Sequence, residues 1–167
     1  MINQGVLTIL ITISKKVVLL STKKADSLRS ERKIKHIVVA LDVSSATNKV
    51  LDKAISLAKL SNAKITGVYV IGIQPTLLSG VINDRETKKA EKILRPMKKY
   101  CEKKGIQFAF KVLIGKPASK ISEFAKRGKV DLVVIGSKGI GGFKGKVLGS
   151  VANSILIESK ASVLLVK

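Results

Sequence analysis

The sequence has few of the residues that build disulfides, metal sites and base-stacking surfaces. Its 167 residues include one cysteine, one histidine and no tryptophan. A single cysteine excludes an intramolecular disulfide and fits a reducing, cytoplasmic environment. Without a cluster of cysteines and histidines, no structural zinc site is encoded. Aromatic residues make up 4% of the chain, which leaves little for stacking on nucleic-acid bases.

Acidic residues are also scarce. The chain has 11 Asp and Glu against 32 Lys and Arg, a formal net charge of +21. Such a surface attracts phosphate ligands, nucleic acid and anionic lipid. Because the lysines are spread through the sequence and not gathered in one stripe, we expect general basicity and keep a dedicated nucleic-acid surface as the alternative. An apolar content of 46% indicates a folded globular protein.

Long apolar runs are missing as well. Residues 1–32 contain only two short ones, 5–13 and 17–20, separated by residues 14–16. A membrane-spanning helix needs about 20 apolar residues, and neither run has the flanks of a secretory signal. We therefore predict two short strands and a basic linker. This hairpin could extend a sheet, cover an apolar patch or pair with another subunit, and a peripheral membrane anchor is the alternative.

From residue 33 onward, strand and helix patterns alternate. Short β-branched runs predict strands at 37–41, 63–71, 106–114, 130–135 and 162–166. Apolar residues at helical spacing predict helices after Ser44, at 83–104, at 117–127 and at 151–158. Pro96 should kink or split the second of these helices, and Gly105 is its C-cap signal. The alternation predicts an α/β fold, a parallel sheet with helices on both faces.

A glycine-rich loop joins the predicted strand at 130–135 to the helix at 151–158. Exposed backbone N–H groups in such a loop, together with the helix dipole, favour an anion, most often a phosphate. Glycine permits positive φ and lets the main chain approach a ligand closely. The Walker A pattern is excluded because Gly145-Lys146 is followed by Val147, and the dinucleotide fingerprint also fails.

The loop instead carries Gly136-x-x-Gly139, nine residues, and then Gly149-Ser150. This pattern resembles the nucleotide-binding signature of the universal stress protein family, in its ATP-binding branch. The resemblance covers residues 33–167 and leaves the first 32 unexplained. It implies an adenine nucleotide alpha hydrolase-like fold, with five parallel strands in the order 3-2-1-4-5.

In that order, strands one and four are neighbours whose connections leave in opposite directions, which opens a crevice at their carboxyl ends. Asp42 would end strand one and Gly136 would end strand four, so the two should meet at this crevice. The resemblance implies that Asp42 accepts hydrogen bonds from base and ribose. Taken alone, Asp42 could merely cap the first helix, and Ser150 is a natural N-cap with or without a phosphate.

The resemblance also implies which residues surround the nucleotide. Main-chain N–H groups of Gly139, Gly149 and Ser150 would meet the phosphates. The pocket walls and the floor under the ribose would come from Ala40, Val43, Val70, Ile135 and Gly136. His36 and Cys101 are expected to be structural.

No catalytic set is evident in the sequence, since hydrolysis needs a positioned general base and a firm metal ligand. We therefore expect a cytoplasmic nucleotide-dependent switch or stress-response binder that holds ATP, with Mg²⁺ bound mainly by the phosphates. The resemblance implies a homodimer formed through the last strand. The alternatives are a basic nucleic-acid-binding protein on the same fold and, less favoured, a weak ATPase.

Overall fold

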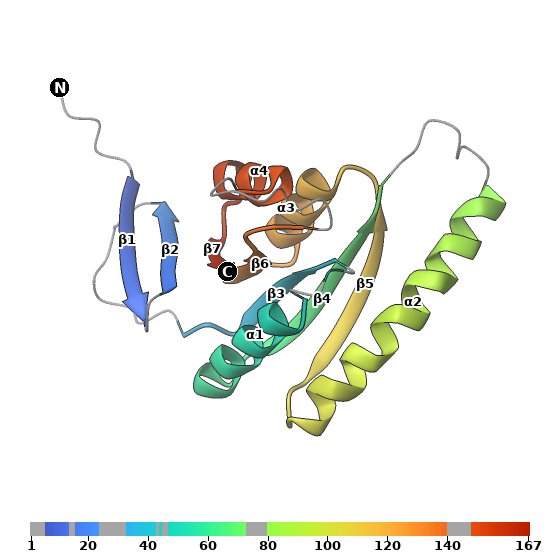
Figure 1. Cartoon of the computed structure of the whole chain (residues 1–167), viewed down its shortest axis with the longest axis horizontal. Coiled ribbons are helices and arrows are strands. Elements are labelled where there is room, and N and C mark those ends of the chain that lie inside the picture. Colours follow the sequence, from blue (N-terminus) through green and yellow to red (C-terminus); the bar gives the residue numbers. More distant parts are fainter. Residues whose placement is uncertain are drawn as a thin grey trace.

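The centre of the molecule is a five-stranded parallel sheet (Figure 1). The computed structural model describes residues 6–13, 16–23, 33–42, 44, 47–72, 80–139 and 148–167. Counted along the chain from residue 33, the strand order is 3-2-1-4-5, so the predicted fold is confirmed. In spatial order the strands are β5 (Phe108–Ile114), β4 (Lys64–Ile71), β3 (His36–Leu41), β6 (Leu132–Gly136) and β7 (Ser162–Val166).

Helices cover both faces of this sheet. One face packs against α1 (Thr47–Ser61) and α2 (Gly80–Lys103), the other against α3 (Pro117–Arg127) and α4 (Ser150–Glu158). The central strand β3 supplies both cores, because alternate side chains of a strand point to opposite faces. Ile37 and Val39 belong to the α1 and α2 side and Val38 to the α3 and α4 side, and all three are fully buried.

The two central strands separate before they end. The β3–β6 ladder runs from Ile37–Leu132 to Val39–Val134, whereas the β3–β4 ladder continues to Leu41–Tyr69. Strand β3 then leads to α1 on one face, and β6 leads to α4 on the opposite face. This arrangement is the switch point at which open α/β sheets bind ligands.

Helix α2 excludes one of the two outcomes expected at Pro96, a split helix. The helix is continuous across this proline and is not split. Leu94 and Cys101 on either side of it are buried in the core, so packing on both flanks holds the helical path despite the lost hydrogen bond. The predicted C-cap is confirmed, since Gly105 has a φ of 74° just beyond the last turn.

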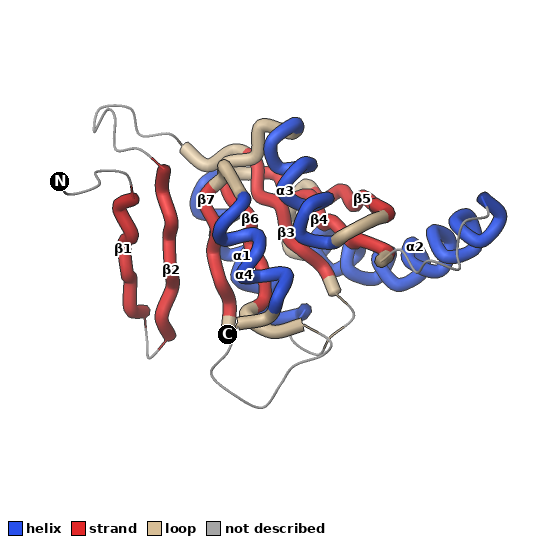
Figure 2. The backbone as a smooth tube through the Cα atoms, turned by 90° about the horizontal axis from the view of Figure 1, so that it is seen from above, coloured by secondary structure: helices blue, strands red, loops and turns tan. Residues whose placement is uncertain are grey.

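The first residues form the predicted hairpin. Strand β1 (Val6–Ile13) pairs antiparallel with β2 (Lys16–Lys23) in a separate two-stranded sheet. Strand β2 lies beside β7, at the edge of the main sheet (Figure 2). The hairpin does not extend the hydrogen-bond ladder of that sheet. Along the described ranges, no helix combines the length and apolar character needed to cross a bilayer.

Candidate functional site

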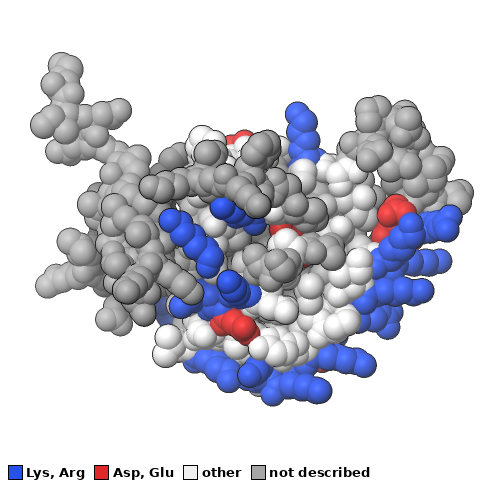
Figure 3. Space-filling model, viewed as in Figure 1, with Lys and Arg blue, Asp and Glu red and all other residues white. Residues whose placement is uncertain are grey.

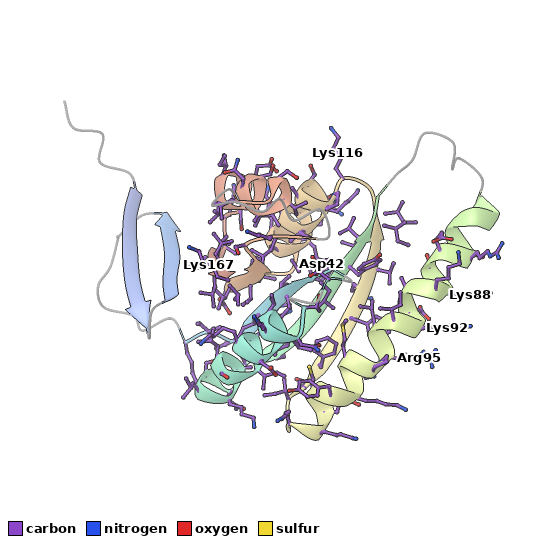
Figure 4. All side chains as sticks on the ribbon, viewed as in Figure 1. Asp42, Lys88, Lys92, Arg95, Lys116 and Lys167 are labelled. Carbon is purple, nitrogen blue, oxygen red and sulfur yellow. The ribbon has the colours of Figure 1, made fainter. Side chains whose placement is uncertain are left out.

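Asp42 follows β3 at the point where this strand separates from β6 (Figure 4). Its Oδ1 accepts hydrogen bonds from the Ser44 backbone N–H (3.2 Å) and the Ser44 hydroxyl (2.6 Å). The hydroxyl of Thr47, the first residue of α1, lies 2.7 Å from the same oxygen and 2.6 Å from the Asp42 carbonyl. One carboxylate oxygen is thus fixed by the start of α1, which sets the orientation of the group.

The other carboxylate oxygen faces the glycine-rich loop. A Cβ placed on Gly139 would lie 3.5 Å from Oδ2 of Asp42. The end of β3 and the loop after β6 are therefore adjacent at the same edge of the sheet, as the sequence predicted. Residues 140–147, which include three further glycines of the loop, lie outside the described residues.

The two described ends of the loop are fastened together. The Ser137 N–H donates to the Val166 carbonyl (2.8 Å), and the Gly149 N–H donates to the Ser137 carbonyl (2.9 Å). A Cβ on Gly149 would lie 3.6 Å from the Gly139 nitrogen. The Gly149 N–H is consequently engaged within the protein, in contrast to the prediction that it would be offered to an anion.

The amino end of α4 lies beside this loop. Gly149 is its N-cap, with φ −61° and ψ 147°, and Ser150 is its first helical residue, which corrects the expectation that Ser150 is the N-cap. No described side chain caps this end. The first N–H groups of a helix have no partner within the helix, and the helix dipole adds positive potential there. This end of α4 can therefore attract an anion.

The predicted apolar wall residues share one face of the sheet. Ala40 and Val70 are half-buried and Ile135 is buried, and all three pack on the side of α3 and α4. Gly136 faces the other side, where an added Cβ would lie 3.4 Å from Cγ2 of Val50. Val43 lies outside the described residues.

The backbone conformation of Gly139 and Gly149 differs from what the sequence predicted. Neither Gly139 nor Gly149 has a positive φ. A side chain on Gly139 would instead occupy the space beside Asp42, and one on Gly149 would lie against the backbone of Ser137 and Gly139. Left-handed backbone is not what requires glycine at these positions.

His36 and Cys101 have the structural roles that the sequence indicated. His36, at the amino end of β3, is buried, with Nδ1 3.3 Å from the Gly128 carbonyl and Nε2 2.8 Å from the Thr66 hydroxyl. Burial lowers the pKa of His36, and nearby Lys64 lowers it further, against opposing effects of the Gly128 hydrogen bond and of Asp131. Cys101 is fully buried in α2, and burial raises the pKa of its thiol to about 12.

Sequence reasoning missed two residues that shape the site. Thr47 is buried and holds Asp42, and Ser137 is buried and ties the ends of the loop together. The spacing Asp42-x-Ser44-x-x-Thr47 was the available signal, because hydroxyls two and five residues beyond an aspartate can fold back onto it. Among the described residues, no group of three His, Cys, Asp or Glu side chains could hold a metal ion.

Comparison with known proteins places the chain among relatives of one kind. The model of the universal stress protein family matches residues 33–167. The universal stress protein MJ0531 of Methanocaldococcus jannaschii is 32% identical over 143 residues, 82% of this chain and 84% of the relative. The universal stress protein YxiE of Bacillus subtilis is 33% identical over 144 residues, 78% of this chain and 97% of the relative.

Solved structures agree with this similarity. A universal stress protein in complex with cAMP has a TM-score of 0.64 and 26% identity, covering 80% of this chain and 97% of the other. The universal stress protein from Archaeoglobus fulgidus in complex with dAMP has a TM-score of 0.64 and 24% identity, covering 81% and 99%. The hypothetical protein MJ0577 has a TM-score of 0.74 and 24% identity, covering 81% and 96%.

Proposed function

This chain belongs to the universal stress protein family, and on that premise we propose that it binds ATP between β3 and β6. The observation that carries the proposal is the approach of Asp42 Oδ2 to Gly139, beside an uncapped helix N-terminus. Relatives with cAMP and dAMP bound support an adenine nucleotide as the ligand class. ATP itself, in place of a monophosphate, is our extension from the resemblance of Gly136-x-x-Gly139 and Gly149-Ser150 to the signature of the family's ATP-binding branch.

We assign the two ends of the nucleotide to different elements. Asp42 Oδ2 would accept hydrogen bonds from the base or ribose, because Oδ1 is already occupied by α1. The apolar walls would be Ala40, Val70 and Ile135, with Val43 and Gly136 completing the set assigned by resemblance to the family.

The phosphates would meet the N–H groups of Gly139 and Ser150 and the Ser150 hydroxyl. Gly149 would contribute by its small size, since its own N–H is engaged. Mg²⁺ fits this arrangement as an ion held mainly by the phosphates, because it retains several waters and needs few protein ligands.

We propose binding with little or no turnover. Hydrolysis requires a base or a water-orienting group near the terminal phosphate. Glu158 is exposed and lies eight residues along α4 from Ser150, about 12 Å at 1.5 Å per residue. Asp42 is assigned to the other end of the nucleotide. The protein would then act as a nucleotide-dependent switch or stress-response binder.

Two matched aspartates test the assignment. Asp42 and Asp131 each accept hydrogen bonds, at the carboxyl and the amino end of β3 respectively. Calorimetry with Mg-ATP should give binding that Asp42→Asn weakens about tenfold, as expected for loss of a charge-assisted hydrogen bond. Asp131→Asn should leave the affinity unchanged. Equal affinity in the Asp42 variant and the parent would contradict the proposal.

We also propose a homodimer formed through β7, an edge strand of the main sheet. Because β2 lies beside β7, two copies can pair there only if the hairpin moves or joins the interface. Light scattering of the full chain and of residues 33–167 separates these routes. A dimer of the shorter chain alone would show that the hairpin blocks pairing, and dimers of both would show that it moves aside. A dimer of the full chain alone would show that the hairpin joins the interface. Monomers in both cases would contradict the dimer.

A further inference from the structure

The outward surface of α2 is a continuous row of cations. These residues follow one another at intervals of three or four, so they lie on one side of the helix. All are exposed, opposite the buried Ala90, Leu94 and Cys101. Figure 3 shows the basic surface over α2, and in Figure 4 the three labelled members extend away from the sheet. We call this row the α2 crest: Arg85, Lys88, Lys92, Arg95, Lys99 and Lys103.

This row revises the expectation of evenly spread basicity. The lysines are spread along the sequence, but the helical period gathers six cations onto one line about 27 Å long. The acidic residues of α2 are Asp84, directly before the first crest residue, and Glu86, Glu91 and Glu102, which pair with Lys89, Arg95 and Lys98.

The cations of the crest have few ion pairs with described acidic side chains. Of its members, only Arg95 has an ion pair with a described side chain, and that distance is 4.0 Å. Lys88, Lys92 and Lys99 have none within the described part of the chain. Like charges three and four residues apart repel, so the row destabilises the isolated helix. A polyanion laid along the crest would remove that repulsion.

We propose that the α2 crest binds the phosphate backbone of double-stranded nucleic acid, without sequence preference. Successive cations are about 4.5–6 Å apart along a rigid helix, which suits a long row of fixed negative charges. The crest carries no aromatic side chain for base stacking, which disfavours single strands. The apolar side of α2 is buried against the sheet, so the helix cannot insert into a membrane surface as amphipathic helices do.

The crest and the nucleotide site are separate. The crest points away from the sheet, whereas Asp42 and Gly139 lie between β3 and β6 at its centre. This inference consequently does not rest on ATP binding. Gly139→Val should leave duplex binding unchanged, so failure of one proposal can be told from failure of the other.

Three crest lysines without ion pairs provide the test. The triple variant Lys88→Gln, Lys92→Gln and Lys99→Gln removes half of the crest charge. Its control removes the same charge from the side of α3 and α4, through the exposed Lys116→Gln, Lys126→Gln and Lys160→Gln. The probe is a fluorescent mixed-sequence DNA duplex of about 16 base pairs, twice the length of the crest at about 3.4 Å per pair.

The full-length protein should bind the duplex with an affinity that falls steeply between about 50 and 200 mM salt. The crest variant should bind at least about tenfold more weakly at about 100 mM salt, with a log–log salt slope reduced by about three. Its thermal stability should not fall, because repulsion is relieved. The control variant should keep the slope of the parent to within about one.

Two results would overturn the proposal. Equal losses in the crest and control variants would mean that binding follows net charge alone. Retained duplex binding by the crest variant, with loss of binding to vesicles containing phosphatidylserine, would identify an anionic membrane surface as the partner instead.

Discussion

The two ends of the central strand β3 carry similar polar groups in different surroundings. At the amino end, both ring nitrogens of His36 have partners, and Asp131 accepts the N–H groups of Lys35 and His36. At the carboxyl end, Asp42 has one oxygen held by α1 and the other facing Gly139. Buried polar groups are normally satisfied within the protein. We therefore assign a structural role to the amino end, where His36 and Thr66 are buried, and propose the ligand site at the carboxyl end, where Asp42 Oδ2 faces Gly139.

We expect the largest effect from a substitution that disrupts the proposed nucleotide site at the carboxyl end of β3 and leaves the amino end intact. Gly139→Val fills the space between Asp42 and the loop, so Mg-ATP affinity should fall by about 100-fold or more, equal to about 2.7 kcal/mol. The fold should persist, because an added Cβ makes only ordinary contacts and the φ of Gly139 is not positive. Calorimetry with thermal unfolding checks both expectations. A folded variant that binds normally would remove Gly139 from the site, and an unfolded one would contradict the expected tolerance of a side chain there.

A substitution of the buried Thr66, near the amino end of β3, should lower stability without changing nucleotide affinity. Thr66→Val leaves Nε2 of His36 without its partner, which should lower the free energy of unfolding by about 1–3 kcal/mol. Nucleotide affinity should not change, because the residue is remote from Asp42 and the loop. Urea unfolding and calorimetry of the same preparation measure the two quantities. Weakened nucleotide binding at full stability would reverse the roles given to the two ends.

Thr47 is the matched residue at the carboxyl end. Thr47→Val removes one of the donors to Oδ1 of Asp42, so the carboxylate keeps only its hydrogen bonds from Ser44 and should be held less firmly. We expect nucleotide affinity to fall by up to about tenfold, since one hydrogen bond to a charged group is lost. Thr47→Ser, which keeps the hydroxyl, should restore most of the affinity. If serine and valine weaken binding equally, the effect comes from packing and not from the hydrogen bond.

The smallest expected effect is a pH dependence at the amino end. Because the folded-state pKa of His36 lies below its unfolded value of about 6.5, the unfolded state binds more protons and stability is lost as pH falls through this range. The free energy of unfolding should decrease between about pH 7 and pH 5. His36 is the only histidine, so His36→Gln should remove this dependence. An unchanged pH profile in the variant would exclude His36 as its source.

Much of the fold could be predicted because its signals are local. The β-branched runs and helical periods mark the elements of the main sheet, and Gly105 marks a helix end. The strand order came from resemblance to the family. Details set by long-range contacts could not be predicted, such as β2 beside β7 and the Gly149 N–H on the Ser137 carbonyl. Pro96 belongs with these, since buried neighbours decide whether the helix continues.

The sequence predicted where the candidate site lies, but it did not predict all of its hydrogen bonds. Asp42 and the loop were placed together by topology, which depends only on where the strands end. The N-cap of α4 is Gly149 and not the expected Ser150, because Asn153 donates to the Gly149 carbonyl. The α2 crest was readable from the spacing of its cations, but a count of net charge does not reveal a period of three or four.

Native mass spectrometry of the folded protein with Mg-ATP measures how many nucleotides each chain holds. We expect one nucleotide per chain in the parent protein and none in Gly139→Val at the same concentration. Equal occupancy in the two proteins, or none in either, would contradict a nucleotide site between Asp42 and the loop.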